Sequence, residues 1–229
     1  MSKKQYFVIV DTETTIEQTV ADFGAVVMDR NGRIVDQIAV LVSDHFDRFD
    51  LWFDPSVDAS AFWSEQNARA RRKKYESMLN SGMRSIASAG YINSWLARVR
   101  GEFQPRGLTA YNISFDLGKC YNTSIDLGGF TRFCLLLASR RHLKRCSAHV
   151  YPKWAINNGY VTKTGRESYS ADAVSHWFYR NLPVEPHTAV EDARDFEAPI
   201  LKALLKRYGW WGIQNLVDAD PSGDENLPN

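Results

Sequence analysis

The sequence predicts an α/β protein in which a mixed five-stranded sheet is flanked by helices. Short apolar runs rich in β-branched and aromatic residues dominate the beginning of the chain, and helical periodicity dominates much of the rest. Strands that come first, with helices interspersed later, are typical of one sheet covered by helices. The 229 residues, 44% of them hydrophobic, are enough for one large core. We therefore expect a single domain over residues 1–212 and a C-terminal segment over residues 213–229.

The first three predicted strands form an antiparallel meander. Residues 6–10 are a short apolar run typical of a buried central strand. Residues 20–29 and 33–42 follow, and Asn31-Gly32 between them is the strongest short signal for a β-hairpin.

Helices and shorter strands alternate through the middle of the predicted fold. Apolar residues near helical spacing predict helices over residues 59–80 and 84–101, with a break at Gly82. Residues 108–111 predict a fourth strand that runs into a helix. Residues 130–138 are the candidate fifth strand, although their leucines leave a helical interpretation open.

The last third of the chain has a less regular pattern. Residues 139–166 carry turn signals and little periodicity, and the resemblance described below does not extend to them with any clarity. Residues 170–180 and 188–208 predict helices that close the body of the fold. The final PSGDENLPN is polar and contains proline and glycine, so we expect a disordered tail.

Composition narrows the classes of function. The formal net charge of +1 argues against a generally basic nucleic-acid binder but leaves local patches open. Two basic runs, residues 69–74 and 140–145, could neutralise phosphates or simply form solvated helix faces. Three cysteines without C-x-x-C spacing argue against a disulfide framework or a zinc site. No stretch matches a signal-peptide core or a membrane span, so we expect a soluble, cytoplasmic protein.

Acidic residues recur at the predicted strand ends. In DTETT, Asp11 and Glu13 lie two positions apart, so their side chains share one strand face while Thr12 points the other way. Such close like charges favour a shared cation, although two exposed acids would give the same pattern. In YNISFD, Asp116 follows Phe115 at a strand-to-helix junction, where α/β sheets bind ligands. It could equally cap the next helix.

The stretch PHTAVEDAR, residues 186–194, predicts a helix that begins with an unusual pair of ionisable residues. Thr188 and Glu191 have the spacing of a capping box, in which each side chain bonds to the other residue's backbone amide. His187 and Asp192 then occupy positions where a hydrophobic staple would place apolar side chains. The alternative is a solvated helix end at which the helix dipole favours an acid.

Together, these acids suggest a site for divalent cations. Asp11, Glu13, Asp116 and Asp192 would supply hard oxygen ligands, which suit Mg²⁺ or Mn²⁺ better than zinc. Two such ions about 3.5–4 Å apart activate water and stabilise the leaving oxygen in phosphodiester hydrolysis. His187 could then accept the proton of the attacking water.

In order and rough spacing, three motifs in this chain resemble those of the DEDDh 3′–5′ exonucleases. The motifs are D-x-E at residues 11–13, N-x-x-F-D at residues 112–116 and H-x-A-x-x-D-A at residues 187–193. This superfamily includes the proofreading epsilon subunit of bacterial replicative polymerase, ribonuclease T and oligoribonuclease. The resemblance spans roughly residues 5–208. The chain departs from it at Ile16, where many members have glycine, and at ADFGAV in the second strand, where many have a glutamate.

The resemblance implies an RNase H-like sheet, two Mg²⁺ or Mn²⁺ ions and stepwise release of nucleoside 5′-monophosphates from a 3′ end. It also implies that Asp11, Glu13 and Asp192 hold the first ion, that Asp11 and Asp116 hold the second, and that His187 is the general base. Residues beside these motifs would bind the terminal nucleotide. They are Thr12, Thr14, Thr15, Asn112 and Phe115.

Our leading expectation is therefore an exonuclease that acts on the 3′ end of single-stranded DNA. An exoribonuclease of the ribonuclease T or oligoribonuclease kind is the alternative, because contacts to the 2′-hydroxyl distinguish RNA from DNA. A non-catalytic nucleic-acid-binding module is the third hypothesis. A homodimer or a polymerase partner could use Trp210 and Trp211, which could instead pack the last helix onto the body.

Overall fold

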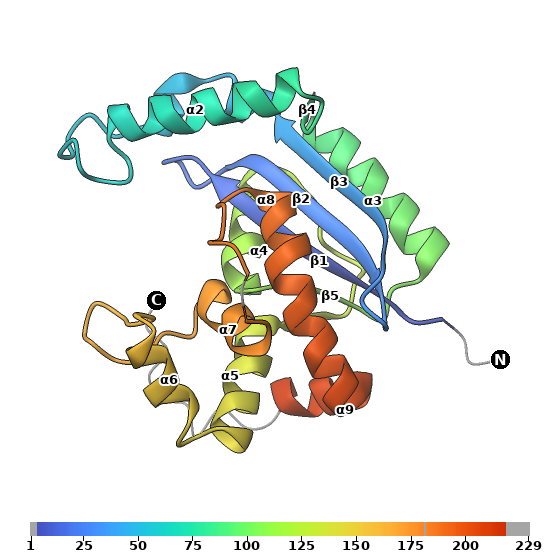
Figure 1. Ribbon diagram of the computed structural model, residues 1–229. Helices are drawn as coiled ribbons and strands as arrows, with labels where there is room; N and C mark the ends of the chain where they lie inside the picture. Colours follow the sequence, from blue (N-terminus) through green and yellow to red (C-terminus); the bar gives the residue numbers. More distant parts are fainter. Residues whose placement is uncertain (1–3, 181, 219–229) are drawn as a thin grey trace.

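The computed structural model describes residues 4–180 and 182–218 and contains one mixed sheet (Figure 1). Its strand order is β4-β3-β2-β1-β5-β6. The strands are β1 (Tyr6–Thr14), β2 (Val20–Asp29), β3 (Ile34–Val42), β4 (Ser85–Ala87), β5 (Gly107–Ala110) and β6 (Arg132–Cys134). Strands β1 to β3 pair antiparallel, whereas β4, β5 and β6 each lie parallel to a neighbour. The expected α/β class with a mixed sheet is confirmed.

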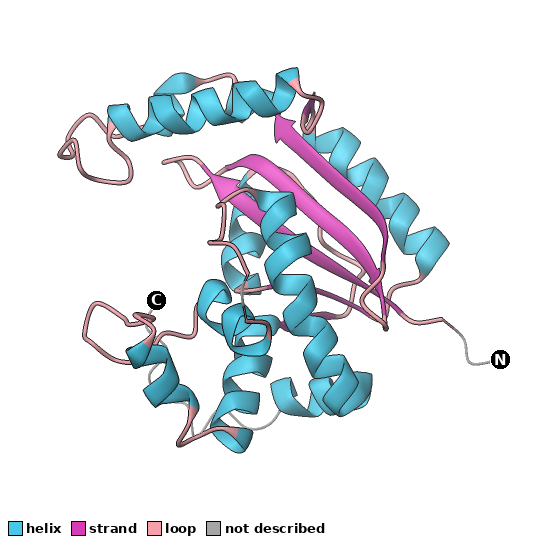
Figure 2. Ribbon diagram, in the orientation of Figure 1, coloured by secondary structure: helices cyan, strands magenta, loops and turns pink. Residues whose placement is uncertain are grey.

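Helices flank this sheet (Figure 2). Along the chain they are α1 (Ser43–Phe46), a 3₁₀ turn (Phe49–Trp52), α2 (Glu65–Asn80), α3 (Ala89–Phe103), α4 (Ile113–Asn122), α5 (Leu135–Cys146), α6 (Tyr151–Asn157), α7 (Ala171–Phe178), α8 (Ala189–Glu191), a π-helical segment (Asp192–Glu197) and α9 (Ala198–Asp218). Helices α3 and α4 pack on one face of the sheet, and α5, α7, α8 and α9 pack on the other.

Alternation along β1 divides the core between these two faces. Phe7 and Ile9 pack in the cluster formed with α5, α7 and α9, whereas Val8 and Val10 pack in the cluster formed with α3 and α4. A third, smaller cluster holds α1, the 3₁₀ turn and α2 against the ends of β2 and β3. The predicted meander is confirmed, and Gly32 at its hairpin has a φ of 87°, which glycine adopts without strain.

Two helix starts were predicted too early, and the sheet has a sixth strand that was not predicted. The helix expected over residues 59–80 begins at Glu65, because Ser64 caps it by accepting from the Asn67 amide at 3.3 Å. The helix expected over residues 84–101 begins at Ala89 after the Ser88 cap, and the residues before that cap form β4 instead.

The predicted strand over residues 130–138 was wrong in its length. Only Arg132–Cys134 pair with β5, and the leucines that follow begin α5, as the helical interpretation allowed. The poorly patterned residues 139–166 contain most of α5 and all of α6. The turn signals fall in the segment after α6, where an isolated antiparallel bridge joins Val161 and Glu167.

The last predicted helix, over residues 188–208, is a composite. The π-helical segment interrupts it, and α9 then continues past a kink at Gly209, where φ is 64°. Because α9 reaches Asp218, the boundary expected at residue 212 falls inside a helix whose Ile213 is fully buried. The tail expected at residues 219–229 lies outside the described residues.

The two aromatic residues considered for an interface differ in their surroundings. Trp210 packs against Phe7, with 5.4 Å between ring centroids, whereas Trp211 is 74% exposed. In the part of the chain that the structure describes, no helix combines the length and the apolar character needed to span a membrane.

Candidate metal centre

The carboxylates of β1 lie at the end of the strand face that α8 and α9 cover. The residues of this face alternate from Phe7 and Ile9 to Asp11 and Glu13. In the β1–β2 register Asp11 lies opposite Gly24, and Glu13 lies opposite Asp22. This face of β1 is therefore apolar along its first half and acidic at its end.

Asp116 reaches the same strand end from the first turn of α4. Its side chain is only 3% exposed, and its Oδ1 accepts a hydrogen bond from the Thr12 hydroxyl at 2.8 Å. Thr12 points away from Asp11 and Glu13, as predicted, and therefore meets α4. Asp116 does not cap that helix, because the N-cap is Asn112, which makes no side-chain capping bond.

The start of α8 differs from the predicted capping box. Thr188 is the N-cap, but its side chain makes no capping bond, and Glu191 bonds to Arg84 rather than to the Thr188 amide. The Thr188 amide instead donates to Oδ2 of Asp192 at 2.9 Å. This bond orients Asp192 and leaves its other oxygen, Oδ1, buried without a hydrogen-bond partner among the described residues.

Small residues allow α8 to approach the sheet closely. A Cβ atom on Gly24 of β2 would lie 2.1 Å from the backbone nitrogen of Val190, so only glycine fits at this point. Ala189 and Ala193 are also fully buried, where α8 and the segment after it pack against the sheet. The backbone of α8 thereby carries Asp192 toward the carboxylates at the end of β1.

His187 lies at the open side of this arrangement. Its backbone has a φ of 52°, an uncommon conformation for a residue that is not glycine and one that is enriched at functional sites. The preceding carbonyl, that of Pro186, accepts a hydrogen bond from Nζ of Lys74 at 2.5 Å. One side-chain ligand atom from each of Glu13, His187 and Asp192 lies within 4.8 Å of the other two.

The carboxylates raise one another's pKa. Burial, followed by repulsion from neighbouring acids, raises the pKa of Asp11 well above its usual value. Burial raises the pKa of Glu13 to about 7, of Asp116 to about 7 and of Asp192 to about 8. Among the described residues, no lysine or arginine forms an ion pair with any of the four. We call Asp11, Glu13, Asp116 and Asp192 the open cluster.

Sequence reasoning missed two more acids beside the open cluster, Glu197 and Glu185. Glu197 is 1% exposed, its Oε1 accepts from the Tyr111 amide at 3.2 Å, and its Oε2 has no partner among the described residues. In an α-helix Glu197 would point about 140° away from Asp192, but the π-helical segment between them brings both residues toward the sheet. Burial raises the pKa of Glu197 and also that of Glu185, the latter to about 7. No sequence signal predicted the π-helical segment.

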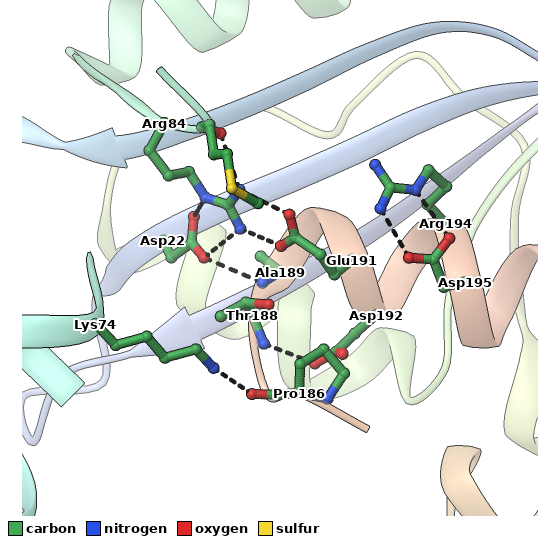
Figure 3. A network of polar contacts seen from close by, with 11 residues as sticks. Asp22, Lys74, Arg84, Pro186, Thr188, Ala189, Glu191, Asp192, Arg194 and Asp195 are labelled. Carbon is green, nitrogen blue, oxygen red and sulfur yellow. Dashed lines mark hydrogen bonds and ion pairs between the residues drawn. The ribbon is translucent and has the colours of Figure 1, made fainter. Parts of the chain in front are cut away.

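A second group of charges lies on the other side of α8 and contains its own cation (Figure 3). The guanidinium of Arg84 donates to both oxygens of Asp22 and to Glu191, and the amide of Ala189 donates to Asp22 Oδ2 at 3.1 Å. Burial raises the pKa of Asp22, and Arg84 offsets part of this effect. Burial also opposes the charge of Glu191, yet hydrogen bonds from Arg84 hold its pKa below the usual value. We call Asp22, Arg84 and Glu191 the closed cluster.

The residues expected to bind a nucleotide do not all reach this centre. Thr12 contacts Asp116, and Phe115 is 47% exposed beside it with the Lys119 ammonium 4.4 Å from its ring centroid. Asn112 is exposed, and Thr14 is half-buried at the end of β1. The Thr15 hydroxyl is buried and bonded to the Thr19 hydroxyl at 2.7 Å, so it is engaged within its own turn.

The basic run at residues 69–74 has mainly structural contacts. Arg71 donates to the carbonyls of Phe62 and Trp52, and Arg72 donates to the carbonyl of Phe46. Because these two side chains hold α2 against the preceding segment, the interpretation of this run as a phosphate patch loses two of its five cations.

The open cluster fits a divalent cation by its chemistry. Carboxylate oxygens are ligands suited to Mg²⁺ or Mn²⁺. The buried Oδ1 of Asp192 provides an acceptor without a donor among the described residues. Glu13 and Asp192 could hold such an ion, with the His187 imidazole beside it.

We also compared the chain with protein-family models and with curated proteins, and neither comparison found a match.

Proposed function

We propose that the chain is a metal-dependent 3′–5′ exonuclease of the DEDDh kind with an RNase H-like fold, acting on single-stranded DNA. The observation that carries the proposal is the open cluster, whose buried and half-buried carboxylates have no ion pair with a lysine or arginine of the described residues and lie beside the exposed His187. The order of the three motifs along the sequence supports the same reaction. Anionic phosphate would be repelled by these acids unless cations were bound between them.

The residues of the centre have different roles in the proposed hydrolysis. Asp11, Glu13 and Asp192 would hold one ion, and Asp11 with Asp116 would hold a second. Bound there, Mg²⁺ or Mn²⁺ would activate the attacking water and stabilise the charge that develops on the leaving oxygen. His187, with a ring nitrogen within 4.8 Å of ligand atoms of Glu13 and Asp192, accepts the proton of that water.

Bond changes follow from this assignment. The water oxygen forms a new bond to phosphorus, and the bond between phosphorus and the 3′ oxygen of the preceding nucleotide breaks. The product is a nucleoside 5′-monophosphate, and the shortened strand keeps a 3′-hydroxyl. Phe115, exposed next to Asp116, offers an aromatic face on which a base can stack.

A time course with 5′-labelled single-stranded DNA tests the proposal. The wild-type protein should produce a ladder that shortens from the 3′ end in Mn²⁺ or Mg²⁺ and no products in EDTA. His187→Ala should slow the ladder by about 10²–10⁴-fold, because it removes the proton acceptor. His149→Ala changes an exposed histidine outside the centre and should leave the rate unchanged.

The same assay with matched RNA distinguishes the alternatives. Cleavage of RNA alone would replace the DNA assignment with an exoribonuclease. An absence of cleavage on both strands, with metal present and the protein folded, would overturn the proposal and favour a binding module.

A further inference from the structure

A cavity of about 940 Å³ lies between α5 and the loop before α7. Its wall includes Tyr111, Arg140, Lys163, Arg166 and Tyr169. This volume falls in the range of ligand-binding pockets. The loop that forms half of the cavity belongs to the poorly patterned part of the sequence, so its position could not be predicted.

The charge of this cavity is mainly positive. Arg140, Lys163 and Arg166 face one carboxylate, that of Glu167. The Nε of Arg140 is buried and has no hydrogen-bond partner among the described residues. Its guanidinium carbon lies 5.6 Å from the ring centroid of Tyr169. A guanidinium with an unused buried donor, together with the exposed Lys163 and Arg166 in the same wall, is suited to anionic phosphates.

The loop that carries two of these cations is ordered by its own hydrogen bonds. The Thr162 amide donates to the Arg166 carbonyl at 2.7 Å, and the Arg166 amide donates to the Thr162 hydroxyl at 3.1 Å. Lys163 therefore lies within a tight turn and not in an extended segment. Lys163 and Arg166 are therefore held by a hydrogen-bonded turn.

Tyr111 connects the cavity with the open cluster. Its amide donates to Glu197 at 3.2 Å, and its hydroxyl donates to the Tyr169 carbonyl at 2.5 Å. The next residue, Asn112, begins the turn that leads to Asp116. Tyr111 thus joins the wall of the cavity to Glu197, which lies beside the open cluster.

We propose that this cavity binds the single-stranded nucleic-acid segment that precedes the terminal nucleotide. Arg140, Lys163 and Arg166 contact its phosphates. This inference rests on the proposed function, because it assigns a path to the substrate of the same centre. It gives Arg140 and the structured loop that carries Lys163 and Arg166 one common role.

The test compares two triple variants of the full chain. Arg140→Gln, Lys163→Gln and Arg166→Gln together remove the cations of the cavity. Arg33→Gln, Arg106→Gln and Lys206→Gln together remove the same charge from exposed positions outside it. Fluorescence anisotropy in EDTA measures binding of a labelled ten-nucleotide DNA or RNA strand across a range of salt concentrations. Hydrolysis of a dinucleotide and of the longer strand is measured separately with Mn²⁺.

The cavity variant should bind the longer strand about 10–100-fold more weakly than the control, and its salt slope should fall by about 2. Its hydrolysis of the dinucleotide should match that of the control, because a dinucleotide has no phosphodiester beyond the one that is cleaved and so offers no further phosphate to the cations of the cavity. Equal binding of the longer strand by both variants would overturn the inference while leaving the exonuclease assignment intact. Binding that depends on the cavity without cleavage of any substrate would support the cavity and reject the exonuclease.

Discussion

Two carboxylate clusters meet at α8, and only one of them contains its own cation. Glu191 and Asp192 are adjacent in sequence, yet Glu191 joins the closed cluster on Arg84 while Asp192 joins the open cluster. Across the sheet, Glu13 and Asp22 are direct neighbours in the β1–β2 register and belong to different clusters as well. Burial raises the pKa of Asp22 and of Asp192, but Glu191, held by Arg84, has a pKa below its usual value.

The comparison teaches how a structural charge site differs from a candidate functional one. Arg84 satisfies the closed cluster internally and fixes α8 to the sheet. The open cluster retains repulsion and the Oδ1 of Asp192, which has no partner among the described residues; both lower stability unless an external cation binds. Proteins break the rules of internal consistency in this way mainly at functional sites. The following predictions test whether the two clusters differ as described.

The largest effect should follow removal of the cation from the closed cluster. Arg84→Met leaves Asp22 buried and unpaired, so the free energy of unfolding should fall by about 3–5 kcal/mol. Arg98→Met, which breaks exposed ion pairs with Asp36 and Glu102, should change it by less than about 1 kcal/mol. Urea denaturation measures both. If the two variants lost equal stability, the closed cluster would not be a structural site.

The next effect is a pH dependence of the metal-free protein. Because the folded-state pKa values of Glu13, Asp116 and Asp192 are raised to about 7, about 7 and about 8, the folded protein keeps protons that the unfolded chain has lost. The contribution of these three groups to stability is therefore fully present below about pH 4 and is lost as the pH rises toward 8.

Between pH 6 and 8.5 in EDTA, the loss should be on the order of 2–3 kcal/mol. Unfolding curves collected with saturating Mn²⁺ should show a smaller loss. A profile in EDTA that stays flat across this range would mean that the open cluster carries no net repulsion.

A smaller effect should come from removing the charge of one acid at a time at alkaline pH. The free energy of unfolding should rise for one of two adjacent residues and fall for the other. Asp192→Asn removes repulsion, and its amide oxygen can still accept from the Thr188 amide, so the metal-free protein should gain about 1–2 kcal/mol. Glu191→Gln weakens the bonds to Arg84 and should cost about 1–2 kcal/mol. Thermal unfolding of both variants at one pH makes the comparison, and changes of the same sign would contradict it.

The smallest effect concerns the backbone beside His187. Lys74→Met removes the donor to the Pro186 carbonyl while keeping the apolar part of the side chain. Because Lys74 is exposed, we expect a reduction of about two- to fivefold in the cleavage rate and little change in stability. Lys73→Met, at the neighbouring exposed position, is the control for loss of charge alone.

Local signals in the sequence predicted the parts of the fold that depend on neighbouring residues. The apolar runs and Asn31-Gly32 predicted the β1–β3 meander, and the spacing around Thr188 located the start of α8. Strand β4 could not be predicted, because three residues without a distinctive pattern pair only with an existing sheet edge.

The candidate site shows the same limit. Asp11, Glu13, Asp116 and Asp192 were recognisable because each lies at the end of a predicted strand or the start of a predicted helix. The Asp22–Arg84 ion pair joins residues 62 positions apart, and no local rule selects it. Glu197 lies near the open cluster only because the segment before it is π-helical, which depends on packing rather than on spacing.

The most direct test of the central claim is titration of the metal-free protein with Mn²⁺ by calorimetry near neutral pH. The wild-type protein should bind Mn²⁺ and unfold at a higher temperature when it is saturated. Asp195→Asn, which changes a partly exposed acid paired with Arg194, should bind like the wild type. Asp192→Asn should bind at least tenfold more weakly, since it removes a ligand of the open cluster. Failure of the wild type to bind Mn²⁺, or equal affinity in Asp192→Asn, would contradict the account.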